Sequence, residues 1–516
     1  MRIKFIMKKI CQLFLLSFLL YSCTAKTKKE AKPAPDFCSS IHCETAGGLS
    51  KKLDSIISLA PNKTGVYTLE DGDGSMTARA WLCENAEKTI DIQYFIFTAD
   101  NVGLIAADYL VRAADRGVKV RILVDDIMVE ADENKLLTLD SHKNISIKIY
   151  NPSTNVGKNA FQKFTYLKTN FAGANQRMHN KTFTVDGRVV ITGGRNIADE
   201  YFDYDHKYNF RDRDVLLIGG ETDKVQQSFN DFWNSPISKP VRELVDTTKF
   251  NFTDPRRFEQ LHQYACDSTN FWPQVRGKIK NIPAAFNEIE KSGKLQWVDS
   301  VEFVSDSPGK NDGLKGLAGG GITTTALINL VKQAKKSIMI QSPYLITTAL
   351  GKKLFQDAVK RGVNIKIMTN SLASTDNLEA FSGYQRDREL LLMTGMKIYE
   401  YKPDAAVRYK IMTGALQQKL NYRPVFGLHA KSMVIDGITT VIGTFNLDPR
   451  SANLNTECVT IIHSEKISRE VLNGMIEELK PENCWETTLI FNPDSQAGFK
   501  KNLKLPAMKL IPKSIL

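Results

Sequence analysis

The chain has 516 residues, of which 42% are hydrophobic, 24% are charged and 9% are aromatic. This composition excludes a disordered chain, a collagen-like fibre and a small disulfide-rich scaffold, and the length allows about three domains. Lysine and arginine number 69 against 57 acidic residues, a formal net charge of +12. The surplus favours polyanionic partners, either nucleic acid or an anionic membrane surface, without choosing between them.

The first segment, residues 1–22, predicts an export signal. A basic start precedes an apolar run from Leu13 to Leu20, which is too short to span a bilayer as a stable helix. The run ends in LYSC at residues 20–23, which resembles the bacterial lipoprotein cleavage box and makes Cys23 the predicted lipidation site. An uncleaved signal anchor is the alternative. Both interpretations place the body outside the cytoplasm and tethered to a membrane, either inner or outer.

Residues 23–50 predict a flexible tether, because the stretch after Cys23 is rich in Lys, Ala and Pro and has no apolar periodicity. An exported protein can oxidise the cysteines that follow, and Cys38 with Cys43 is the most local candidate pair. No group of cysteines has the spacing of a zinc site. We therefore interpret the cysteines as structural.

The body of the chain contains an internal repeat. Residues 86–94 lead through a helical stretch to residues 114–124, and residues 334–342 lead in the same way to residues 359–369. Each copy predicts a strand, a helix that ends at a glycine, and a second strand. Strands separated by helices form a parallel or mixed sheet that helices cover, so the repeat predicts an α/β pseudo-dimer.

The chain therefore divides into six predicted parts. These are the signal (1–22), the tether (23–50), a first lobe (51–240), a connecting segment (241–310), a second lobe (311–490) and a basic-apolar tail (491–516).

A second repeated pattern carries the chemistry. It reads RMHNKTFTVDG at residues 177–187 and LHAKSMVIDG at residues 428–437, and in both copies Lys follows His by two residues, Asp by seven and Asn by seventeen. The pattern selects His179, Lys181, Asp186 and Asn196 in the first copy, and His429, Lys431, Asp436 and Asn446 in the second.

This spacing has a physical meaning. Alternate residues of a strand share one face, so the His and Lys of each copy project together. The Asp-Gly pair then turns the strand into a hairpin, whose second strand returns the Asn to the same place. A phosphate between the two copies would meet two ammonium groups, two amides and two imidazoles, which stabilises a phosphoryl transition state without a metal or cofactor.

The pattern resembles the HKD motif of the phospholipase D superfamily. Residues 175–202, 369–402 and 428–457 are most similar to the C-type bacterial cardiolipin synthases. The resemblance implies an α/β fold of two phospholipase D-like lobes forming a pseudo-dimer, each a mixed sheet flanked by helices, with one active site at their junction.

The resemblance also implies residue roles. His179 would attack the phosphodiester and carry a covalent phosphatidyl group, and His429 would be the general acid and base. Lys181, Lys431, Asn196 and Asn446 would bind the phosphoryl oxygens. We expect Glu457 to orient His429, and Asp212, with Asp214 as a neighbouring alternative, to orient His179. For Asp186 and Asp436 we expect turn positions with structural hydrogen bonds.

The last 18 residues alternate apolar and basic side chains, as interfacial membrane segments do. Pro506 and Pro512 argue against one long helix. A disordered tail and a segment that contacts a membrane surface are both open interpretations.

The functional hypothesis is a phosphatidyltransferase that makes cardiolipin from phosphatidylglycerol and a second phospholipid through a phosphatidyl-histidine intermediate. A phospholipase D that forms phosphatidic acid with water is the first alternative, and a nuclease is a weaker one. A non-catalytic lipid-binding protein is disfavoured because both His-Lys pairs and both Asn residues are present. Expected partners are phospholipids and a membrane surface, not nucleic acid, and no cofactor or metal is expected.

Overall fold

The computed structural model describes most of the chain beyond the predicted export signal. The described residues are 37–40, 48–128, 133–153, 155–157, 171–248, 250–254, 256–271, 273–280, 287, 289, 291–310, 319–412 and 424–516. Residues 1–36, with the predicted lipidation site Cys23, and residues 41–47, with Cys43, lie outside this set.

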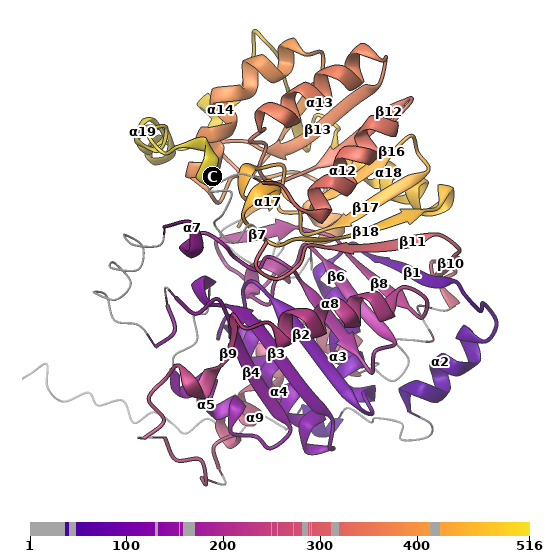
Figure 1. Cartoon of the computed structure of the whole chain (residues 1–516), viewed down its shortest axis with the longest axis vertical. Coiled ribbons are helices and arrows are strands. Elements are labelled where there is room, and N and C mark those ends of the chain that lie inside the picture. The colour runs from indigo at the N-terminus through magenta and orange to yellow at the C-terminus, as the bar shows by residue number, and fades with distance from the viewer. Residues whose placement is uncertain are drawn as a thin grey trace, which may run out of the picture.

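The first lobe is built on a nine-stranded mixed sheet in the order β10-β1-β8-β6-β5-β2-β3-β4-β9 (Figure 1). Its strands are β1 (Thr64–Leu69), β2 (Thr89–Tyr94), β3 (Lys119–Asp125), β4 (Ile145–Tyr150), β5 (Thr182–Val185), β6 (Val189–Gly193), β8 (Asp214–Ile218), β9 (Ser238–Pro240) and β10 (Gln296–Val298). β2, β3 and β4 run parallel, and the other pairings are antiparallel.

Helices cover both faces of this sheet, since alternate residues of a buried strand point to opposite sides. Ile122 and Val124 of β3 pack in the same core cluster as α3 (Gly72–Asn85) and α4 (Asn101–Asp115). Leu123, between them, packs in a separate cluster with Phe229 and Phe232 of α8 (Thr222–Asn234). The short helix α5 (Glu133–Asp140) leads into β4.

The second lobe repeats the design on an eight-stranded sheet in the order β11-β18-β17-β16-β12-β13-β14-β19. The strands are β11 (Val301–Ser305), β12 (Ser337–Gln341), β13 (Asn364–Asn370), β14 (Lys397–Tyr401), β16 (Ser432–Ile435), β17 (Thr439–Gly443), β18 (Cys458–His463) and β19 (Cys484–Thr487). Its helices include α12 (Ile322–Gln333), α13 (Ala349–Lys360), α14 (Leu378–Met393), α17 (Pro449–Asn453) and α18 (Glu465–Glu478).

The predicted strand-helix-strand repeats are confirmed as β2-α4-β3 and β12-α13-β13, each with parallel strands. A glycine with positive φ follows each helix, Gly117 at 101° and Gly362 at 88°. In that left-handed conformation glycine lacks the steric strain that a Cβ atom introduces, which explains why both copies end their helix at glycine.

The two lobes share a buried core and a small sheet of their own. Val190 and Leu217 of the first sheet belong to the same apolar cluster as Ile442 and Ile462 of the second. In addition, β7 (Tyr208–Arg211) of the first lobe pairs in parallel with β15 (Val425–Leu428) of the second. The pseudo-dimer predicted from the repeat is therefore confirmed, and backbone hydrogen bonds cross its junction.

The segment predicted as a connection contributes to both lobes. β10 extends the first sheet and β11 extends the second, while α9 (Glu259–Ala265) packs on α4 and α10 (Pro273–Lys280) on α3.

The prediction that Cys38 pairs with Cys43 is wrong, because Cys38 forms a disulfide with Cys266, just after α9. The reason is that the segment around Phe37 packs against the residues that follow α9. The amide of Phe37 donates to the carbonyl of Cys266 at 2.7 Å, and the Phe37 ring packs on Phe271 with centroids 5.1 Å apart. These contacts carry the start of the described chain to α9.

The interpretation of the C-terminus as a disordered tail is also wrong. Phe499–Met508 form helix α19, which packs against α14, and the last residues end in a short 3-10 helix, η7 (Lys513–Ile515). Among the helices of the described residues, none is long and apolar enough to cross a bilayer.

Candidate active site

The two motifs stand at the amino ends of equivalent hairpins. His179 and Lys181 occupy the extended residues that lead directly into β5, and His429 and Lys431 lead in the same way into β16. All four residues are buried, none more than 6% exposed. The hairpins β5-β6 and β16-β17 then return the chain toward Asn196 and Asn446, as the spacing predicts.

The motif aspartates lie at the opposite ends of these hairpins. Asp186 adopts φ 53° in the turn, and its carboxylate accepts backbone N–H groups from Glu87, Lys88 and Thr89. Asp436 adopts φ 52° and makes the same three contacts with residues 335–337. These contacts fasten the hairpin turn to the start of the neighbouring strand, so the motif aspartates act on the backbone.

Each histidine is held by a carboxylate from the other lobe. Nδ1 of His179 lies 2.8 Å from Oε2 of Glu457, and Nδ1 of His429 lies 2.6 Å from Oδ2 of Asp212. The expected pairing of Glu457 with His429 and of Asp212 with His179 is therefore wrong, and the two partners are exchanged. Asp214, the neighbouring alternative, instead binds Ser75 and Arg79 inside the first lobe.

The exchange follows from backbone pairing across the junction. The amide of His179 donates to the carbonyl of Thr456 at 2.9 Å, and the amide of His429 donates to the carbonyl of Arg211 at 2.8 Å. Each accepting carbonyl belongs to the residue just before the carboxylate that orients that histidine. The segment that fixes the backbone of a histidine thus also supplies the partner of its ring.

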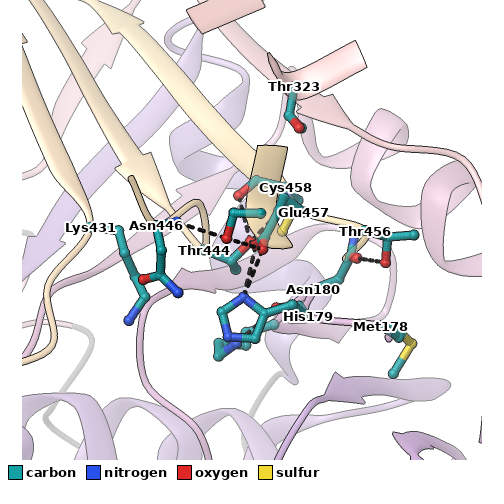
Figure 2. Close-up of polar contacts among 12 residues, drawn as sticks. Met178, His179, Asn180, Thr323, Lys431, Thr444, Asn446, Thr456, Glu457 and Cys458 are labelled. Atoms are coloured by element: carbon teal, nitrogen blue, oxygen red, sulfur yellow. Dashed lines mark hydrogen bonds and ion pairs between the residues drawn. The ribbon is translucent and has the colours of Figure 1, made fainter. Parts of the chain in front are cut away.

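The two carboxylates have different surroundings. Glu457 accepts a hydrogen bond from the hydroxyl of Thr444 (Figure 2) and another from the hydroxyl of Ser451. Our sequence reasoning missed both hydroxyl residues. Asp212 accepts the backbone N–H of Arg213 at 2.7 Å. Thr444 could have been found from the repeat, since it lies two residues before the motif Asn446, at the position that Gly194 occupies in the first copy.

These surroundings shift the pKa values of the two carboxyls in opposite directions. Burial raises the pKa of Glu457 to about 7. Burial acts in the same direction on Asp212, but the interaction with His429 and the charges of Lys431 and Arg195 hold the pKa of Asp212 below its usual range. At neutral pH, His429 therefore faces an ionised carboxylate, whereas the carboxyl that faces His179 has a raised pKa.

Burial and neighbouring charges favour the neutral form of both imidazoles. Burial, together with the charges of Lys181 and Lys431, lowers the pKa of His179 well below its ordinary value. Burial and the charge of Lys431 lower the pKa of His429 to about 3, although Asp212 opposes the shift. The lysine of each motif therefore acts on the histidine of the other, which indicates a single shared site.

The groups that we expect to bind phosphate are two buried lysines and two amides. Nζ of Lys181 donates to the carbonyl of His179 at 2.7 Å, and Nζ of Lys431 lies 2.9 and 3.0 Å from the two ring nitrogens of His429. Burial lowers the pKa of Lys181 to about 7 and that of Lys431 to about 8. Among the described residues, Oδ1 of Asn446 is buried without a hydrogen-bond partner.

Two further residues orient the motif from the ends of equivalent parallel strands. Oδ2 of Asp125, the last residue of β3, accepts the N–H of Met178 at 2.7 Å. Oδ1 of Asn370, the last residue of β13, accepts the N–H of Leu428 at 2.8 Å. Each fixes the residue just before a histidine. Our sequence reasoning missed both, although their matching places in the repeat were a usable signal.

Aromatic rings close the site around the imidazoles. The ring of Phe95 lies edge-on to His179 at 5.0 Å between centroids. Tyr201 and Phe210 contact His429 at 5.0 and 4.7 Å. Such walls exclude water from the imidazoles and strengthen electrostatic interactions inside the site.

One group of possible metal ligands occurs in the described residues, and it lies apart from the histidines. It comprises Cys38, Asp108 and Cys266. The two sulfur atoms are joined in the disulfide and offer no thiolate.

The fold and the site define a two-lobed enzyme of the phospholipase D superfamily that transfers a group from a phosphodiester. In each histidine Nδ1 contacts the orienting carboxylate, which leaves Nε2 as the atom that can act as nucleophile or as general acid and base. At His429 this atom lies 3.0 Å from Nζ of Lys431. Two ammonium groups in the same enclosure can neutralise the charge of a phosphoryl transition state.

Comparison with known proteins agrees with this class. The family model described as "Cardiolipin synthase, PLD-like domain" matches residues 82–233 and 327–478. Cardiolipin synthase C of Escherichia coli K12 is 33% identical over 446 residues, which cover 86% of this chain and 90% of that protein. Cardiolipin synthase 1 of Bacillus cereus is 24% identical over 454 residues, 88% of this chain and 73% of that protein.

Among solved structures, the phosphatidylserine synthase of Haemophilus influenzae Rd KW20 superposes with a TM-score of 0.56 at 15% identity, covering 90% of this chain and all of that one. At this identity the likeness shows a shared fold. Taken with the family match, the chain belongs to the cardiolipin synthase family of phospholipase D-like phosphatidyltransferases.

Proposed function

We propose that this enzyme makes cardiolipin by transferring a phosphatidyl group from one phospholipid to a glycerol hydroxyl of phosphatidylglycerol. The observation that carries the proposal is the exchanged pair of His–carboxylate contacts, which brings two oriented imidazoles and two ammonium groups into one buried site at the lobe junction.

The reaction proceeds in two steps, formation of a phosphatidyl-histidine and transfer of its phosphatidyl group. In the first, Nε2 of His179 attacks phosphorus, the bond from phosphorus to the headgroup oxygen breaks, and His429 gives its Nε2 proton to the departing alkoxide. In the second, His429 takes the proton of the incoming hydroxyl, whose oxygen attacks phosphorus as the P–N bond to His179 breaks. Lys181, Lys431, Asn196 and Asn446 bind the phosphoryl oxygens throughout.

The unequal carboxylates support this division of roles. A general acid must carry a proton when the donor lipid is bound, and the ionised Asp212 stabilises an imidazolium at His429. The phosphate anion of the donor lipid also offsets the charges of Lys181 and Lys431, which lower the pKa of His429. The nucleophile must be neutral, and burial together with the charges of Lys181 and Lys431 lowers the pKa of His179 well below its ordinary value.

We also propose that residues 1–22 direct export and that Cys23 carries the lipid anchor, so that the enzyme works at a membrane surface on phospholipids, without nucleic acid as partner. The basic-apolar signal and the LYSC sequence support this proposal. The Cys38–Cys266 disulfide supports it independently, since such bonds persist in oxidising compartments outside the cytoplasm.

The test is a product assay with the purified full chain. Phosphatidylglycerol, alone or with phosphatidylethanolamine, should give cardiolipin and free glycerol or ethanolamine, and His179→Ala and His429→Ala should each abolish the product. Phosphatidic acid as the sole product would establish the hydrolase instead. Cleavage of plasmid DNA with no change in the lipids would overturn both lipid assignments.

A further inference from the structure

Helix α19 turns an apolar stripe outward. Phe499 and Leu503 of the helix are 78% and 68% exposed, and Leu510, just beyond its end, is 86% exposed. With the exposed Pro506 they recur every three or four positions, which is the spacing of a single helical face. Leu505, on the side that packs against the lobe, is only 5% exposed.

This orientation is opposite to that of an ordinary surface helix, whose apolar side faces the core. Single exposed hydrophobic residues are normal on protein surfaces, but a row of four on one helical face marks a contact surface. We call the row Phe499, Leu503, Pro506 and Leu510 the α19 stripe.

Basic side chains flank the α19 stripe. Lys500 and Lys504 lie on one side of it along the helix and Lys509 on the other, and all three are exposed. Residues 495–516 contain five lysines and no acidic residue. An apolar stripe between rows of lysine suits the interface of an anionic bilayer, where apolar side chains enter the acyl region and lysines reach the headgroups.

One end of this segment is fixed to a loop that lies against the active site. Nζ of Lys501 donates to the carbonyls of Ala373 and Thr375 at 3.0 and 2.6 Å. The carbonyl of Ser374, between them, accepts the hydroxyl of Tyr208. Tyr208 packs edge-on against Phe210, whose ring lies 4.7 Å from that of His429.

The other end is fixed beside the first motif. The amide of Arg450 donates to the carbonyl of Leu516 at 3.3 Å, and its guanidinium donates to the carbonyl of Ile515 at 3.2 Å. The same guanidinium binds Oδ1 of Asn175 at 2.9 Å, four residues before His179. Figure 1 accordingly shows α19, the C-terminus and α7 (Phe171–Ala174) on the left side of the molecule, with α17 between them and its centre.

We propose that the α19 stripe docks on an anionic phospholipid bilayer and thereby holds the loops around the two histidines at the lipid surface. The choice of lipid as partner rests on the proposed function, but the docking is measurable without turnover. The surface is a second membrane contact, distinct from an anchor at the N-terminus, and it sets the orientation of the lobes on the bilayer.

The first experiment measures insertion directly. The full chain carrying Leu503→Trp is reconstituted with vesicles of phosphatidylglycerol and brominated phosphatidylcholine, and its fluorescence is compared with that of the unsubstituted chain. The matched control is Leu59→Trp, because Leu59 is 82% exposed and follows α2 (Leu49–Ile57), on the opposite side of the molecule (Figure 1). We expect lipid bromine to quench the tryptophan introduced at 503 and not the one introduced at 59.

The second experiment separates docking from chemistry. The double variant Phe499→Ser/Leu503→Ser should lose about tenfold or more of its activity on phosphatidylglycerol vesicles, because two large apolar contacts with the bilayer are removed. Its activity on monomeric short-chain phosphatidylglycerol, which requires no interface, should equal that of the parent chain. Leu59→Ser should leave both activities unchanged.

Several outcomes would overturn the proposal. These are equal quenching at both positions, an unchanged vesicle activity of the double variant, and an equal loss of its activity on both substrates. If lipid bromine quenches the tryptophan at 503 but the enzyme transfers no phosphatidyl group on either substrate, the docking proposal stands and the proposed function is refuted.

Discussion

Glu457, the residue just before β18 in the second lobe, is hydrogen-bonded to Nδ1 of His179 in the first lobe at 2.8 Å. Asp212 and His429 form the reciprocal contact in the opposite direction. Neither motif histidine takes its carboxylate from its own lobe, so a separated lobe would leave its motif imidazole unoriented. Catalysis by this scheme requires both lobes to be docked.

The exchanged pairing can be observed by nuclear magnetic resonance. In protein labelled with nitrogen-15 at histidine, each Nδ1 proton that is bonded to a carboxylate gives a strongly downfield signal. Glu457→Gln should displace the signal of His179, and Asp212→Asn that of His429, with kcat falling about 10²–10⁴-fold in both. If Glu457→Gln displaced the signal of His429 and Asp212→Asn that of His179, the contacts between lobes described above would be contradicted.

The roles of the two histidines predict different behaviour toward an activated substrate. A phosphatidyl ester of p-nitrophenol needs no general acid for departure of the leaving group. His429→Ala should therefore release about one equivalent of nitrophenolate and retain the phosphatidyl group on His179. His179→Ala should give no burst. Mass spectrometry of the peptide locates the adduct, and an adduct on His429 in the parent chain would reverse the assignment.

The buried lysines predict an alkaline limit to activity. Burial lowers the pKa of Lys181 to about 7 and that of Lys431 to about 8, so their positive charges are lost as the pH rises through this range. In the pH profile of kcat/KM, which reports the free enzyme, activity should fall on the alkaline side. Lys181→Arg keeps its charge and should move this limb to higher pH. A profile that stays flat to pH 10 in the parent chain would contradict the requirement for both charges.

The motif aspartates predict an effect on stability without an effect on chemistry. Asp436→Ala removes the acceptor of three backbone N–H groups and should lower the free energy of unfolding by about 1–3 kcal/mol. Its kcat below the melting temperature should stay within about twofold of the parent value. Asn tolerates positive φ, so Asp436→Asn should cost less. A large loss of kcat in a folded Asp436→Ala protein would instead indicate a catalytic role.

The Cys38–Cys266 disulfide predicts a stability that depends on oxidation. It closes a loop between residues 228 positions apart, so Cys38→Ser should lower the free energy of unfolding by about 2–5 kcal/mol. Denaturant unfolding with and without reductant measures this difference. A reductant should destabilise the parent chain but leave Cys38→Ser unchanged, and equal sensitivity of the two would show that another bond is being reduced.

Much of the architecture could be predicted because it depends on local patterns. The alternation of apolar residues and the glycine at the end of each helix are properties of short segments, so the repeat predicted β2-α4-β3 and β12-α13-β13. The spacing within each motif likewise sets which residues lie together on a hairpin. His179 with Lys181, and His429 with Lys431, follow from chain geometry alone.

Contacts between segments that lie far apart in the sequence could not be predicted from such local patterns. Nearness in sequence favoured Asp212 for His179 and Cys43 for Cys38, but the partners in the structure are Glu457 and Cys266. Both outcomes were decided by docking of segments more than 200 residues apart, at the lobe junction and at α9. The apolar and basic residues of the tail were likewise evident from the sequence. Only packing of Leu505 and Lys501 against the second lobe determined that the apolar stripe faces outward.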